Sequence, residues 1–218
     1  MRQIDSAEIL QMEQRFRTIF INSISGFKSL QMVGTINNGG NTNLALFSSI
    51  FHVGANPPYL GMVVRPDGNE HETIQNIMFN NVYTLNNVIS NNYKNAHQTS
   101  ARYLAGESEF SACDFTEEYI EGFAAPFVKE SNIKIGLEFK EYLPFLLNKT
   151  KIVIGEIKHI LIDDDLIGGD GFVDLNMANA VTSAGLDAYY TTNPLARLSY
   201  AKPGKQVEEL NVNNKRNN

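Results

Sequence analysis

The sequence has little of what several classes of protein require. Its 218 residues include one cysteine, Cys113, and no tryptophan. A single cysteine excludes an intrachain disulfide and fits a reducing compartment, so we expect a cytoplasmic protein. No apolar run reaches the roughly 18 to 20 residues that would cross a bilayer, and the N-terminus lacks the apolar stretch of a signal peptide. We therefore expect no membrane segment.

Basic residues are also few. Lysine and arginine total 18 against 24 acidic residues, which gives a formal net charge of -6. This balance argues against a nucleic-acid partner, since duplex binders carry excess positive charge. The sequence contains no glycine-rich nucleotide loop and no hydrolase motif, and its four scattered histidines form no zinc pattern with the lone cysteine. We expect no metal and no nucleic acid.

What is present is mainly the alternating pattern of β-strands. Apolar and polar residues alternate from Ser29 to Ile36, the sequence Asn37-Asn38-Gly39-Gly40 is typical of a tight turn, and Leu44–Phe51 is predicted to be the return strand. Further strands are predicted at residues 60–64, 82–85 and 133–139, and around Val153, Ile157 and Leu161. Because strands do not alternate regularly with long helices, we predict a mainly β fold with short helices, built as a small closed barrel.

Short helices are predicted between these strands. Residues 6–20 carry an apolar stripe at helical spacing behind a capping residue, Asp5, and residues 72–80 and 93–103 are further helix candidates. The sequence thus divides into an N-terminal helical extension (1–25), one β domain (26–203) and a polar, flexible tail (204–218).

One polar block meets the demands of a flavin mononucleotide. Arg65 and Thr73, the latter near a helix N-terminus, are suited to a phosphate, and Asn43, Ser48 and Ser49 offer donors and acceptors to a ring edge. Taken one at a time, each residue is better explained by turn chemistry, strand polarity or a helix start than by ligand binding. Only the order and spacing of the set favour binding.

These residues also carry a family resemblance. The block GTINNGGNTNLALFSSIFHVGANPPYLGMVVRPDGNEHETIQNIMFNNVYTLNNV resembles the flavin reductase-like family with the FMN-binding split barrel, which includes flavoredoxins and the reductase components of two-component monooxygenases. That family shows asparagine, alanine and serine on a strand pair, then Pro-Pro, a helix start with Thr and Asn-Ile, and a strand ending in Val-Asn. The later segments AHQTSARY, NKTKIVIGEIKHILIDDDLI and GFVDLNMANAVTSAGLDAYY also resemble the family, so the likeness spans residues 15–203.

The resemblance implies a Greek-key split barrel that binds FMN, with FAD as the alternative, and takes a hydride from NADH or NADPH. It also implies a homodimer with flavin at the interface and a partner monooxygenase or other electron acceptor. No catalytic residue is required, because the cofactor does the chemistry. The implied cofactor-binding residues are Thr42, Asn43, Leu44, Ala45, Ser48, Ser49, Arg65, Thr73, Asn76, His97 and Ser100.

One departure bears on phosphate binding. The family's usual lysine before Asp-Thr is replaced by His71, so Arg65 must carry more of the charge or His71 must contribute when protonated. Three functions stay open from sequence: an NAD(P)H-dependent flavin reductase, a non-catalytic FMN-binding electron or flavin carrier, and a barrel-type dimer that acts through protein contacts without flavin.

Overall fold

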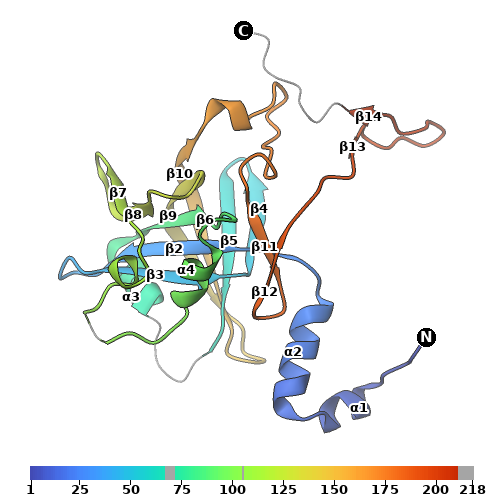
Figure 1. Ribbon diagram of the computed structural model, residues 1–218, viewed down its shortest axis with the longest axis horizontal. Helices are drawn as coiled ribbons and strands as arrows, with labels where there is room; N and C mark the ends of the chain where they lie inside the picture. Colours follow the sequence, from blue (N-terminus) through green and yellow to red (C-terminus); the bar gives the residue numbers. More distant parts are fainter. Residues whose placement is uncertain (67–71, 105, 211–218) are drawn as a thin grey trace.

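In the computed structural model, which describes residues 1–66, 72–104 and 106–210, one antiparallel sheet dominates (Figure 1). Its seven strands lie in the order β3-β2-β6-β9-β10-β5-β4. Their bounds are Gln31–Ile36 (β2), Thr42–Phe47 (β3), Ile50–Ala55 (β4), Pro58–Val64 (β5), Val82–Asn87 (β6), Ile133–Pro144 (β9) and Lys151–Ile162 (β10). The mainly β fold is confirmed. The prediction of a closed barrel is wrong, since β3 and β4 are the two edges of the sheet and do not pair.

The gap between these edges falls inside a segment predicted to be one strand. The expected return strand Leu44–Phe51 is interrupted at Ser48-Ser49, where the chain leaves β3 and enters β4. The register of β2 and β3 pairs Thr35 with Asn43, and β4 pairs only with β5. The serines therefore connect the two edges of the open sheet, which alternation of apolar residues alone did not reveal.

Smaller sheets surround the main one. Strand β1 (Lys28–Ser29) pairs with β11 (Val181–Ala184), which pairs with β12 (Ala188–Thr191), and β7 (Glu117–Ile120) pairs with β8 (Phe123–Val128). Strand β13 (Arg197–Leu198) pairs with β14 (Glu209–Leu210) at the upper right of Figure 1. This last pair includes part of the segment expected to be a flexible tail, and residues 211–218 lie outside the described residues.

The helices are short. The predicted helix 6–20 is instead two helices, α1 (Ser6–Gln11) and α2 (Gln14–Ile24), because Met12 adopts an extended conformation and Glu13 caps α2 through the N–H groups of Arg15 and Phe16. Helix α3 (Glu72–Asn80) has its predicted bounds, and α4 (Tyr93–Gln98) ends five residues before the predicted Tyr103. Helix α5 (Glu109–Ala112) and a 3-10 turn (Asp164–Leu166) complete the set in the described residues.

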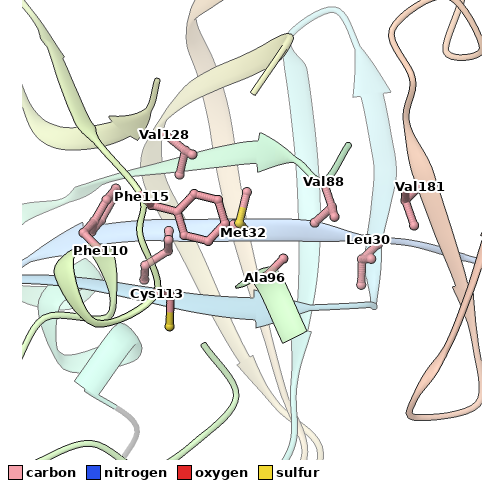
Figure 2. Packing of buried hydrophobic residues seen from close by; sticks show 10 residues of the cluster. Leu30, Met32, Val88, Ala96, Phe110, Cys113, Phe115, Val128 and Val181 are labelled. Atoms are coloured by element: carbon pink, nitrogen blue, oxygen red, sulfur yellow. The ribbon is translucent and has the colours of Figure 1, made fainter. Parts of the chain in front are cut away.

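Two large apolar clusters, and a smaller third around Phe123 and Phe127, pack against the main sheet. The first, drawn in Figure 2, joins β2 and β3 to the segments around α4 and α5 through side chains such as Met32, Leu44 and Phe110. The second lies inside the curved sheet and includes Tyr83, Leu137 and Val153. Burial of such side chains stabilises the fold by about 1.5 to 3 kcal/mol each. In the described part of the chain, none of the helices has both the length and the apolar character needed to traverse a bilayer.

Candidate flavin site

A cleft of about 880 Å³ opens beside the Ser48-Ser49 junction. Its walls come from β3, the end of β5, the start of α3, the segment after α4, helix α5, and the β11–β12 hairpin. This volume falls within the range of small-molecule and cofactor sites. The open edge of the sheet therefore coincides with a cleft large enough for a cofactor.

Seven of the eleven residues predicted from sequence line this cleft. They are Asn43, Ala45, Ser48, Ser49, Arg65, Thr73 and Ser100. The other four, Thr42, Leu44, Asn76 and His97, do not line it. The structure thus gathers residues from four separate segments at one surface. Their contact with a flavin stays a prediction.

The alternation of side chains along a strand explains part of this division. On β3, Asn43 and Ala45 face the cleft, so the neighbouring Thr42 and Leu44 point to the other side of the sheet. Thr42 Oγ1 donates to Glu117 Oε1 at 2.6 Å and lies 2.7 Å from Ser108 Oγ. Leu44 is fully buried in the first apolar cluster. Any contact of these two residues with a ligand would have to be made by backbone atoms.

A buried polar network holds Asn43 in one orientation. Its Oδ1 accepts hydrogen bonds from Thr73 Oγ1 at 3.0 Å and from Thr35 Oγ1 at 3.3 Å, and its Nδ2 donates to Glu109 Oε2 at 2.9 Å. Asn76 Nδ2 donates to Thr35 Oγ1 at 3.1 Å. The predicted residues Thr73 and Asn76 thus support Asn43 from α3, and the hydroxyl proton of Thr73 is already used within the protein.

Glu109 was not predicted as a site residue. It lies on α5 and lines the cleft, and its Oε2 accepts from both Asn43 Nδ2 and the Leu44 N–H at 2.9 Å. Burial raises the pKa of the Glu109 carboxyl above its ordinary value of 4.5, although the bonds from Leu44 and Asn43 oppose the shift. No local pattern in the sequence marks Glu109, because it meets β3 from about 65 residues away.

This raised pKa predicts a pH dependence of stability. A carboxyl whose pKa is higher in the folded chain favours folding when protonated, and this contribution is lost as the pH rises from about 4.5 through the raised pKa. We expect the free energy of unfolding of the wild type, relative to that of Glu109→Gln, to decrease over this pH range. Urea titrations of both proteins from pH 4 to pH 7 measure the difference, and parallel curves would contradict it.

Basic groups line another part of the cleft. Arg65 follows β5, and its Nη2 donates to Asn22 Oδ1 on α2 at 2.7 Å. Arg102, a second cation that the sequence analysis did not select, lies in the segment after α4 beside the predicted Ser100. Within the described ranges neither arginine pairs with a carboxylate. His71, expected near the phosphate, lies outside the described residues.

His97 lies behind the cleft wall and reaches it through another residue. Its Nδ1 is 2.5 Å from the hydroxyl of Tyr189, a residue of β12 that does line the cleft. The rings of Tyr93 and Tyr189 also pack together, with centroids 5.6 Å apart. Burial, and then the charge of Asp187, raise the pKa of Tyr189, so its hydroxyl stays protonated at neutral pH. Tyr189 offers the cleft a flat aromatic surface.

Cys113 and His159, two residues whose side chains could take part in catalysis, do not line the cleft. Cys113 is buried in the first apolar cluster, and burial raises the pKa of its thiol, with smaller effects from Glu109 and Asp114. This opposes a reactive thiolate. His159 packs its ring against Phe123 and does not line the cleft. Across residues 1–66, 72–104 and 106–210, no group of three or more histidine, cysteine, aspartate or glutamate side chains is arranged to hold a metal.

Comparison with known proteins identifies the domain. The flavin reductase like domain family matches residues 27–182. A protein from Shewanella frigidimarina NCIMB 400, assigned as a flavin reductase with a split barrel domain, has a crystal structure that superposes with a TM-score of 0.89 at 47% identity, covering 92% of this chain and 100% of that one. None of the curated proteins matches the chain.

More distant structures share the fold. Nitrilotriacetate monooxygenase component B from Bacillus cereus superposes with a TM-score of 0.80 at 18% identity, covering 91% of this chain and 98% of that one. Flavoredoxin of Desulfovibrio vulgaris (Miyazaki F) superposes with a TM-score of 0.67 at 21% identity, covering 82% and 91%. The open sheet is therefore the split barrel that the family resemblance implied, not the closed barrel that the strand pattern predicted, and the chain belongs to the flavin reductase-like family.

Proposed function

We propose that this protein binds FMN in the cleft and uses NADH or NADPH to reduce flavin. The observation that carries the proposal is the composition of the cleft, where arginines without carboxylate partners in the described chain adjoin a strand edge rich in hydrogen-bonding groups. A phosphate needs the cationic arginines, and an isoalloxazine edge needs the hydrogen-bonding groups. FAD is the alternative cofactor, and the family membership supports either flavin.

The residues divide into two roles. Arg65 contacts the phosphate, because a guanidinium offers five donors and Asn22 occupies only one of the Nη2 protons. Asn43, Ser48 and Ser49 face the flavin ring, with Thr73 and Glu109 holding the Asn43 amide in place. Tyr189 and Ser100 also line the cleft, so we assign the aromatic ring and the hydroxyl of these two residues to further contacts with the flavin.

When bound, a flavin would supply the redox chemistry by accepting a hydride, which is two electrons and a proton, from NADH or NADPH, which would become NAD⁺ or NADP⁺. The protein's part is to orient the two rings and to limit the access of water. No side chain needs to act as an acid or base in that transfer, and the described residues that line the cleft include neither a histidine nor a cysteine. We propose that the reduced flavin then serves a partner monooxygenase or another electron acceptor in the cytoplasm.

We further propose that the protein works as a homodimer. Neither α1 nor α2 contains a buried residue, and apolar side chains of α2 lie open to solvent, among them Phe16 (58% exposed) and Ile24 (64% exposed). Figure 1 shows both helices at the lower right, set off from the sheet. An apolar surface of this kind favours coverage by another chain. Light scattering at micromolar concentration tests this, and a mass of one chain, 24.3 kDa, would contradict it.

Steady-state oxidation of NADH and NADPH tests the activity. With FMN added, we expect the absorbance at 340 nm to decrease much faster than it does with free flavin and pyridine nucleotide in the absence of the protein. A rate that saturates with increasing FMN concentration would show that the reaction takes place at a binding site of the protein and not in solution. A protein that binds FMN without this turnover would be a flavin or electron carrier, and the reductase proposal would fail.

A further inference from the structure

An asparagine of the N-terminal extension contacts the cation of the cleft. Asn22 Oδ1 accepts from Arg65 Nη2 at 2.7 Å and from Lys28 Nζ at 3.4 Å, while its Nδ2 donates to the Thr18 carbonyl at 2.7 Å. These partners fix the orientation of the amide, since two cationic donors require the oxygen and the helix carbonyl requires the NH₂ group. Asn22 thus links helix α2 to Arg65.

This arrangement concentrates positive charge. Lys28 also donates to the Gly185 carbonyl at 3.2 Å, and its pKa is lowered first by burial and then by the charge of Arg65. Both cations share a neutral acceptor, and neither forms an ion pair with a carboxylate of residues 1–66, 72–104 or 106–210. An aspartate at position 22 would offer the same acceptor oxygen but would cancel one charge. The neutral amide holds Arg65 and leaves its charge for an anion.

We propose that Asn22 is a positioning residue for a phosphomonoester subsite in which Arg65 is the contacting cation and Lys28 lies behind it. This inference rests on the proposed function, because the phosphate belongs either to FMN or to the adenosine ribose of NADPH. The matched family domain begins at residue 27, and α2 ends at Ile24. A helix outside that domain therefore sets the affinity of the cleft for phosphate.

Pairs of ligands that differ only by the phosphate provide the test. Fluorescence titration gives the dissociation constants of FMN and riboflavin, and of NADPH and NADH, for the wild type, Asn22→Ala and Asn22→Asp. In Asn22→Ala we expect the preference for the phosphorylated member of one pair to fall about threefold, because Arg65 loses its anchor. In Asn22→Asp we expect the preference for the phosphorylated ligand to fall about fivefold at low salt. This fall should become smaller as the ionic strength rises, because salt screens the added charge. Binding of the unphosphorylated member should not change.

Two controls separate positioning from a general effect on the fold. Thr18→Ala lies one turn earlier on the same helix, and its hydroxyl donates only to the Gln14 carbonyl, so the preference for phosphate should stay at the wild-type value. In an Arg65→Ala background, Asn22→Ala should have no further effect, since the group it positions is gone. Additive effects of the two substitutions would overturn the proposed coupling.

The outcomes identify the ligand and separate the two proposals. If only the preference for FMN over riboflavin changes, the subsite binds the flavin phosphate. If only the preference for NADPH over NADH changes, the subsite binds the phosphate of the pyridine nucleotide. If Asn22→Ala keeps the wild-type preference for the phosphorylated ligand, the positioning role of Asn22 is overturned, whatever the result for Asn22→Asp. A wild type that binds riboflavin and FMN equally, and NADH and NADPH equally, overturns the subsite but leaves the flavin site standing. A wild type that binds no flavin overturns both.

Discussion

Replacing Gly34 with alanine is expected to lower the free energy of unfolding by about 3 kcal/mol or more. A Cβ atom at this position would lie 2.3 Å from the Pro126 carbonyl oxygen and 2.5 Å from Thr84 Oγ1. The carbonyl belongs to β8, which packs across β2 here, and it already accepts the Thr84 hydroxyl at 2.6 Å. Because the obstacle is backbone, relief requires β8 to move away from the sheet and open the core beside it.

Urea denaturation of Gly34→Ala measures this loss. Gly39→Ala is the matched control in the turn of the same β2–β3 hairpin, where the nearest atom to an added Cβ is a side-chain atom, Asn37 Oδ1, at 3.3 Å. We expect the control to unfold near the wild-type midpoint. A Gly34→Ala protein of wild-type stability would mean that β8 does not lie against β2 as described.

Replacing Arg65 with alanine is expected to weaken FMN binding at least tenfold, which is the loss of about 1.4 kcal/mol or more that removal of a hydrogen bond to a charged group produces. The fold should tolerate the change, because Arg65 is exposed and its described hydrogen bond goes to Asn22 on a helix without buried residues. Fluorescence titration with FMN measures the dissociation constant. Riboflavin, which lacks the phosphate, should bind the variant and the wild type alike.

Arg15→Ala supplies the control for this substitution. It removes the same charge from the exposed part of α2, outside the cleft, so FMN affinity should stay within about twofold of the wild type, as expected for a screened surface charge. If Arg65→Ala binds FMN as tightly as the wild type does, Arg65 is not a phosphate ligand. If FMN and riboflavin weaken equally, Arg65 acts on the ring or on the shape of the cleft.

Local patterns predicted some elements of the fold well. The turn at residues 37–40 follows from asparagine and glycine, and the apolar spacing of Ile74, Ile77 and Met78 predicted the bounds of α3. The predicted bounds were wrong where two non-apolar or non-helical residues interrupt a continuing apolar pattern, at Met12-Glu13 and at Ser48-Ser49. The apolar stripe of residues 6–20 runs across Met12 without revealing that its backbone is extended, and the apolar run after Leu44 continues past the break at Ser48.

The cleft could be predicted only in part, because its walls come from distant segments. The order of polar residues from Asn43 to Thr73 selected one wall. Strand alternation, applied to β3, would have removed the side chains of Thr42 and Leu44 from the predicted cofactor-binding residues. Glu109, Arg102 and Tyr189 could be found only in the folded chain, since packing between elements brings each of them to the cleft.

A crystal structure of the protein with FMN bound most directly tests whether the cleft at the open edge of the sheet is a flavin site. We predict that the phosphate lies within hydrogen-bond distance of the Arg65 guanidinium and that the isoalloxazine lies against β3 near Asn43, Ser48 and Ser49. Crystals soaked at saturating FMN that show an empty cleft, or flavin bound at another surface, would contradict this account.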